Sequence, residues 1–220
     1  MTRNVFAPNT LRGVTYGQYV RFRDDPRNDQ LWMTFDDGVL ELMSSEFRQG
    51  FGSDRIGLIV RAVAAVFKVP LQGARSTTFR KGRIGTRQGQ GKEPDQSFYF
   101  ANAPAIRNHD SINLEIDPPP DLWIEVDNSG SSRGRLPLYA ALGVPEAWRY
   151  RARRGMLWFG RRVGDGYEEI DQSLSLPMLT PAIVLDLLSK AVAAPDEGTW
   201  DEAMRDWLRR VLKPAHEAGG

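Results

Sequence analysis

The chain has no cysteine and only two histidines among its 220 residues. Without cysteine there can be no disulfide, no thiol nucleophile and no thiolate metal site. His109 stands alone on an expected loop, and one histidine does not make a metal-ligand set. Thiol chemistry and a histidine-based metal site are therefore not expected.

Long apolar runs are also missing. No segment approaches the ~20 consecutive apolar residues that a membrane-spanning helix needs. The first ten residues, MTRNVFAPNT, lack the apolar core of a signal peptide. We therefore expect a cytoplasmic protein that does not use a membrane as a partner.

Neither sign of charge is in excess, since 29 basic and 28 acidic residues leave a net charge of +1. Basic residues nevertheless gather in two stretches, 75–92 and 149–162. Local patches of this kind can hold a polyanion such as nucleic acid, although solvated loops and strand edges are the simpler interpretation of each stretch alone.

The segment Pro118–Tyr150 organises the rest of the chain. Its residues 121–127 read as a strand, and the side chains of a strand alternate between two faces. One face carries an apolar row, and the other carries three carboxylates and a tryptophan: Asp121, Trp123, Glu125 and Asp127. Like charges on one face repel one another unless they bind something.

A second expected strand, Glu93–Phe100, also presents an acid. Asp95 lies on the face opposite its apolar row, and the two strands are far enough apart in sequence to be neighbours in a sheet. Carboxylates from adjacent strands would form a hard-oxygen site for Mg²⁺ or Mn²⁺. From spacing alone, however, solvent-facing strand acids remain the more common explanation.

The remaining elements predict an α+β or mixed α/β fold, with helices on both faces of a sheet. Hairpins are expected over 31–43 and 156–171, a strand over 73–79, and a polar, glycine-rich loop over 80–91. Helices are expected over 15–23, 53–67, 134–142, 181–193 and 198–212. We divide the chain into a main domain, 1–194, and an amphipathic helix with a tail, 195–220. The Trp/Leu stripe of that helix suits either packing or self-association into a homodimer.

Several phrases of the sequence are similar to a known family: FDDGVLELMS at 35–44, STTF at 76–79, EPDQSFYF at 93–100, the long segment 118–150, and SLSLPMLTP at 173–181. Together they cover about residues 15–190. The chain resembles the Uma-type restriction endonuclease family, a branch of the PD-(D/E)XK nuclease superfamily.

The resemblance implies a restriction-endonuclease-like fold, built on a four-stranded mixed β-sheet flanked by helices. It also implies that Asp95 and Glu125 hold Mg²⁺ or Mn²⁺ for hydrolysis of phosphodiester bonds. The expected partner is nucleic acid, with DNA as the first choice, and the expected class is a metal-dependent endonuclease.

The chain departs from the pattern of that superfamily at its lysine. The usual lysine position, two residues after the glutamate, is Asp127, and the alternative position on the next helix is Arg135. We retain both as candidate catalytic positions, although arginine can stabilise negative charge but cannot serve as a general base. Lys81 is another candidate for the missing lysine. The first helix of relatives opens with histidine and glutamate, where this chain has 47–50 and then Asp54.

These departures keep two alternatives open. The chain could be a nuclease fold with impaired chemistry that binds nucleic acid, or an interaction or regulatory module that uses the sheet as a scaffold. For Glu41 on the first hairpin, an exposed acid is preferred to a site residue.

Overall fold

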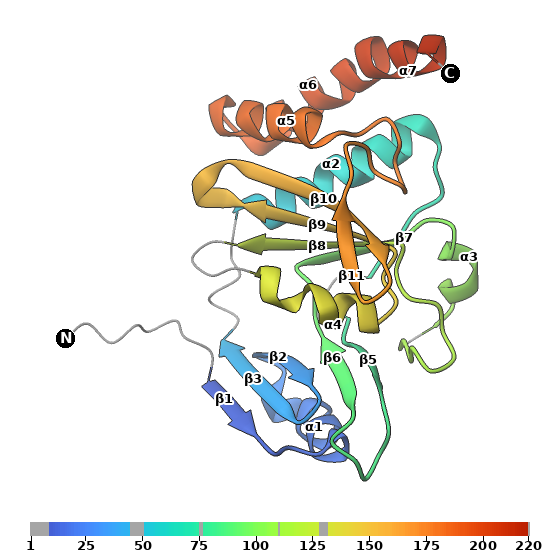
Figure 1. The fold of residues 1–220 in the computed structure, drawn as a ribbon. Coiled ribbons are helices and arrows are strands. Elements are labelled where there is room, and N and C mark those ends of the chain that lie inside the picture. The colour runs from blue at the N-terminus through green and yellow to red at the C-terminus, as the bar shows by residue number, and fades with distance from the viewer. Residues whose placement is uncertain (1–8, 45–50, 75–76, 110, 128–131, 220) are drawn as a thin grey trace, which may run out of the picture.

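A computed structural model describes residues 9–44, 51–74, 77–109, 111–127 and 132–219 of the chain (Figure 1). Two β-sheets form its framework. The smaller sheet has the order β1-β3-β2-β6-β5 and is antiparallel throughout. Its strands are β1 (Asn9–Arg12), β2 (Leu31–Asp36), β3 (Val39–Ser44), β5 (Phe79–Gly82) and β6 (Gly89–Lys92).

The larger sheet has six strands in the order β11-β10-β9-β8-β7-β4. Only β8 and β9 pair in parallel in the described part of the chain, so this sheet is mixed. Its strands are β4 (Gln72–Gly73), β7 (Gln96–Tyr99), β8 (Leu122–Asp127), β9 (Glu146–Arg151), β10 (Met156–Val163) and β11 (Gly166–Glu169). The predicted α+β class with a mixed sheet is confirmed, and the sheet is larger than the four strands expected.

Helices cover both faces of the larger sheet. One face packs against α2 (Phe51–Phe67), α5 (Pro181–Ala193) and α6 (Glu197–Trp207), which lie together above the sheet in Figure 1. The short helix α4 (Leu136–Ala141) lies on the opposite side, between the two sheets. Further helices are α1 (Tyr16–Arg23), α3 (Ala103–Ile106) and α7 (Lys213–Gly219).

The alternation predicted for β8 is confirmed. Leu122 and Ile124 are fully buried in the core beneath α2 and α5. Trp123 points to the other face, where it packs in a second core with Phe79 and Tyr139. The face that carries the acids is therefore covered as well, and Trp123 is a packing residue.

The expectation of a loop over 80–91 is wrong, because β5 and β6 pair there as an antiparallel hairpin. The glycines that suggested a loop are instead required by close packing. A Cβ atom at Gly82 would lie 2.6 Å from Tyr16 Cδ2, and one at Gly91 would overlap the ring of Tyr19. The glycines therefore let the tyrosines of α1 lie directly on the strands. The single strand expected over 73–79 is replaced by two strands at its ends, β4 and the start of β5.

The C-terminal stripe packs inside the chain. Trp200, Met204 and Leu208 are buried in the same core as α2 and α5, and the indole of Trp200 donates to the carbonyl oxygen of Leu187 at 3.0 Å. Packing, one of the two roles expected for this stripe, is thus observed, while the domain boundary at 194 stays a prediction. Within the described ranges, no helix is both long and apolar enough to span a bilayer.

Candidate active site at the junction of the two sheets

The structure brings Asp95 and Glu125 together. In the register of β7 and β8, Gln96 faces Ile124, so one further step places Asp95 opposite Glu125. Residues that face each other across antiparallel strands project to the same side of the sheet. Asp95 Oδ2 accepts a hydrogen bond of 2.7 Å from the backbone N–H of Val126, the residue next to Glu125. The predicted neighbourhood of the two acids is therefore observed.

Other groups fix the direction of each carboxylate. The indole N–H of Trp123 donates to Glu125 Oε1 at 2.8 Å, and Trp123 itself has no exposed surface. On the other side, the hydroxyl of Ser53 in α2 lies 3.4 Å from the carbonyl oxygen of Asp95 and holds the backbone there. Asp95 and Glu125 are only 9% and 5% exposed, so both carboxylates lie in a largely dry setting.

A lysine that the sequence did not single out completes this group. Lys92 Nζ lies 3.3 Å from Glu125 Oε1 and donates to the carbonyl oxygen of Glu93 at 2.9 Å. Its exposure is 1%, which is rare for a lysine unless it is paired. Lys81, the candidate suggested by the sequence, is exposed and borders a separate hollow with Asp37 and Glu115. The structure thus brings Lys92, rather than Lys81, to the two acids.

The site lies where the two sheets join. Lys92 is the last residue of β6 in the smaller sheet, and the chain then passes through Asp95 into β7 of the larger sheet. A second link crosses the same junction, because Arg135 Nη2 lies 2.8 Å from Glu41 Oε2 of β3. Glu41 is half-buried and paired, and not the exposed acid that the sequence favoured.

Arg135 lies at the start of α4 and interacts electrostatically with Glu125 and Glu41. Burial lowers its pKa, but the tyrosine hydroxyl of Tyr139 and the charges of Glu125 and Glu41 outweigh this effect, so the pKa is raised overall. Arg135 therefore remains a cation beside the acids. It can stabilise negative charge there, as expected from the sequence.

Asp127, which stands at the usual lysine position of the superfamily, pairs with an arginine. Its Oδ2 lies 2.9 Å from Nη2 of Arg149 on the neighbouring parallel strand β9, and both side chains are more than nine-tenths buried. A buried ion pair of this kind holds Asp127 to the sheet. Its role in catalysis stays a prediction.

Asp121 and His109 both make contacts within the chain. Asp121 accepts hydrogen bonds from the backbone N–H groups of Phe100 and Asn102, at 2.6 and 3.1 Å, and so closes the turn before α3. His109 Nδ1 lies 3.2 Å from Asp117 Oδ1. The segment 47–50 lies outside the described residues, and Asp54 is exposed on α2.

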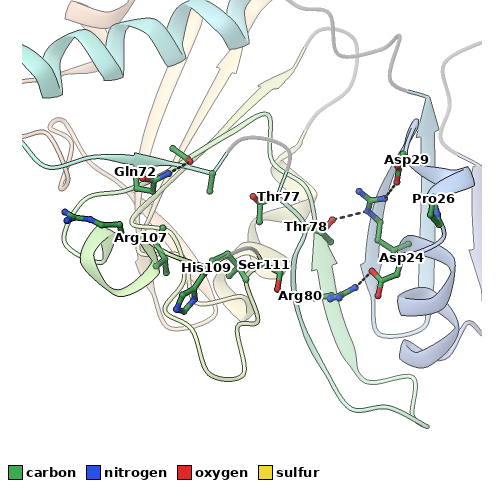
Figure 2. Close-up of a pocket in the computed structure, with 15 residues that line it drawn as sticks. Asp24, Pro26, Asp29, Gln72, Thr77, Thr78, Arg80, Arg107, His109 and Ser111 are labelled. Atoms are coloured by element: carbon green, nitrogen blue, oxygen red, sulfur yellow. Dashed lines mark hydrogen bonds and ion pairs between the residues drawn. The ribbon is translucent and has the colours of Figure 1, made fainter.

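A separate pocket of about 480 Å³ opens between α1 and the segment around α3 (Figure 2). Its basic residues largely serve internal contacts. Arg23 Nε lies 2.5 Å from Glu93 Oε1, Thr78 donates to the same carboxylate at 2.8 Å, and Arg80 pairs with Asp24 at 2.6 Å. Neither Asp95 nor Glu125 lines this pocket. We therefore place the candidate site at the two acids and not in the pocket.

Asp95 and Glu125 suit a divalent cation with hard oxygen ligands. Mg²⁺ commonly uses one or two carboxylates and keeps several waters, so two acids are sufficient. No group of three or more acidic or histidine side chains converges anywhere in the described ranges. The two acids, oriented by Trp123 and Val126, remain the expected ligands of such an ion.

The comparisons with known proteins identify the family of the chain. No curated protein matches the chain. A family model described as Uma2, putative restriction endonuclease, matches residues 17–192, which include Lys92, Asp95, Glu125 and Arg135. This match spans most of the chain and every strand of both sheets except β1. The chain therefore belongs to the Uma2 family of the restriction-endonuclease-like superfamily.

Proposed function

We propose that the chain is a metal-dependent endonuclease that hydrolyses phosphodiester bonds of DNA with Mg²⁺ or Mn²⁺. The observation that carries this proposal is the facing pair Asp95 and Glu125, with Lys92 Nζ 3.3 Å from Glu125. Membership of a restriction endonuclease family supports a nucleic-acid substrate. Two facing carboxylates with a neighbouring cation suit phosphoryl chemistry, which depends mainly on charge and position.

Each residue has a distinct role in this proposal. A divalent cation held by Asp95 and Glu125 would supply positive charge for the phosphate and lower the pKa of water. Lys92 helps to place Glu125, whose Oε1 lies 3.3 Å from its Nζ, and it supplies the cation that the superfamily usually takes from a different position. Arg135 adds a fixed positive charge at the start of α4. The proton that the water loses must pass to a group other than Arg135. A guanidinium keeps its own proton and cannot act as a general base.

Plasmid nicking tests the proposal. Wild-type protein should nick supercoiled DNA with Mg²⁺ or Mn²⁺, while Asp95→Asn and Glu125→Gln should lose most of this activity. These amides preserve side-chain volume and remove the charge, and Glu125→Gln also removes the negative charge that faces Lys92. Glu168→Gln, on the exposed edge strand β11, is the matched control and should cleave normally. Absence of nicking with either metal, or full activity in both site variants, would refute the proposal.

A second candidate function is nucleic-acid binding without cleavage. It is favoured by the ion pairs of Asp127 with Arg149 and of Arg135 with Glu41, since neither expected lysine position holds a titratable amine. This candidate predicts DNA binding that weakens steeply with salt and survives both Asp95→Asn and Glu125→Gln. Binding that does not respond to salt would count against it.

A further inference from the structure

Arginines adjoin the candidate site at one end of the larger sheet. The strand β9 runs parallel to β8, and in their register Arg149 faces Glu125 while Arg151 faces Asp127. Arg149 contacts Asp127 on the face of the sheet that carries the acids, and side chains two residues apart share a face, so Arg151 projects to that face as well. Arg151 therefore lies on the same face as Glu125, about 7 Å further along the strands.

Two more arginines follow directly. The 3₁₀ turn η4 (Ala152–Arg154) continues from β9, and Gly155 ends it in the left-handed conformation, with its N–H donating to the carbonyl oxygen of Ala152 at 3.3 Å. Both Arg153 and Arg154 are exposed. The turn from β9 to β10 lies beside the end of β8, on the left of Figure 1. A short, hydrogen-bonded turn thus holds two accessible arginines at the end of the sheet where the acids lie.

The charges of these three arginines are not compensated within the described ranges, where none of them forms an ion pair. Other arginines of the same two strands are paired: Arg149 with Asp127 at 2.9 Å, and Arg161 with Glu168 at 3.3 Å. Three like charges within four residues repel one another, and a polyanion that lies across them removes this repulsion. Guanidinium groups suit phosphate in particular, because they can donate two parallel hydrogen bonds to its oxygens.

We propose that Arg151, Arg153 and Arg154 bind backbone phosphates of DNA beside the bond that is cleaved at Asp95 and Glu125. Phosphate contacts of this kind fix the position of a duplex without reading its sequence. The inference rests on the proposed function, because it extends the binding surface of the same site. It places the DNA across the carboxyl ends of β8 and β9.

The test compares two double variants that remove the same charge. Arg153→Gln/Arg154→Gln changes the proposed surface, and Arg161→Gln/Arg162→Gln changes two exposed arginines at the far end of β10, where Arg161 faces Glu146 at the start of β9. Binding of a labelled 30-base-pair DNA duplex is measured in Ca²⁺ over a series of salt concentrations. The first variant should bind about 10- to 100-fold more weakly, and its plot of log K against log salt should be shallower by about two. The control should keep the affinity and the slope of the wild type.

Arg151→Gln is measured alone, because this side chain is half-buried, and it should reduce the slope by about one. Tm should stay within about 2 °C of the wild type for the two exposed pairs, so weaker binding does not reflect unfolding.

The remaining outcomes are distinguishable. If Arg153→Gln/Arg154→Gln binds DNA with the affinity and slope of the wild type, the inference fails, while metal-dependent nicking by the wild type would leave the proposed function standing. Equal weakening in both double variants would show that only net charge matters, and this also overturns the inference. If the wild type neither binds nor nicks DNA, the proposed function fails and the inference fails with it.

Discussion

The ammonium nitrogen of Lys92 lies 3.3 Å from Oε1 of Glu125. The two residues are only 1% and 5% exposed. Both charges have been taken out of water, and each compensates the other for that loss. The pair also joins the two sheets, since Lys92 ends β6 and Glu125 lies in β8. Stability and the candidate chemistry therefore depend on the same contact.

Replacing Lys92 with methionine should destabilise the protein by about 3–5 kcal/mol, because a buried carboxylate loses its counter-charge. The double variant Lys92→Met/Glu125→Gln removes both charges and should be more stable than Lys92→Met alone. Urea unfolding of the wild type, the two single variants and the double variant measures this coupling.

Lys81→Met is the matched control for that cycle. Lys81 lies on the neighbouring strand β5 but is exposed, so its loss should change stability by no more than about 0.5 kcal/mol. Additive effects of Lys92→Met and Glu125→Gln would show that the two charges do not interact, contrary to the geometry.

Trp123→Phe should weaken the candidate metal site while keeping an aromatic ring in the core. The change removes the indole that donates to Glu125 at 2.8 Å. Loss of a group that orients a metal ligand commonly reduces metal affinity or activity by about 10- to 100-fold. Calorimetric titration with Mn²⁺ and plasmid nicking both report this loss.

The neighbouring strand offers a close control in Trp148→Phe. Trp148 donates its indole N–H to Glu146 at 2.7 Å, again to a glutamate two residues away, and it is equally buried. Both variants should therefore lose comparable stability, but only Trp123→Phe should affect Mn²⁺ binding. Equal effects on Mn²⁺ binding in the two variants would contradict a specific role for Trp123.

Much of the site could be predicted from local pattern. The period of two in residues 121–127 separates Leu122 and Ile124 from Glu125, and the structure keeps this separation. Predicting that Asp95 lies beside Glu125 required only that their two strands be neighbours in a sheet. Such features follow from side-chain alternation, which sequence records directly.

Lys92 could not be found in the same way, because its role depends on contacts far away in sequence. It closes a glycine-rich stretch whose composition is typical of loops, but this stretch pairs with β2 and β5 as a strand and packs against the tyrosines of α1. A signal was nevertheless present: Gly89 and Gly91 alternate with Gln90 and Lys92 at the spacing of a strand. The ion pairs of Asp127 with Arg149 and of Glu41 with Arg135 likewise depend on tertiary structure.

Gly91→Ala tests whether this packing holds β6 in place. An added Cβ would overlap the ring of Tyr19, which is fully buried and stacks on Phe35. Neither ring can move freely, so we expect a loss of about 1–3 kcal/mol, the usual cost of overpacking. Thermal unfolding measures it. Gly166→Ala is the control, since a Cβ there meets no atom within 4 Å. A Gly91→Ala variant as stable as this control would show that Tyr19 of α1 does not pack tightly against β6.

Glu146 should make stability depend on pH. It is completely buried at the start of β9, and burial raises its pKa above the ordinary value of 4.5, although hydrogen bonds from Trp148 and from the backbone N–H of Ser175 oppose the shift. The unfolded chain therefore releases this proton near pH 4.5, while the folded protein still holds it. Over that interval the unfolded state binds fewer protons, so the free energy of unfolding falls as the pH rises.

The variant Glu146→Gln isolates this contribution, because the amide has no proton to release and keeps the same shape. The free energy of unfolding of Glu146→Gln minus that of the wild type should increase as the pH is raised from 4.5. It should then level off once the folded protein has also released its proton. Other carboxylates titrate in both proteins and cancel in the difference. Urea unfolding at closely spaced pH values measures this curve, and a difference that stays constant or falls would show that burial does not penalise the charge of Glu146.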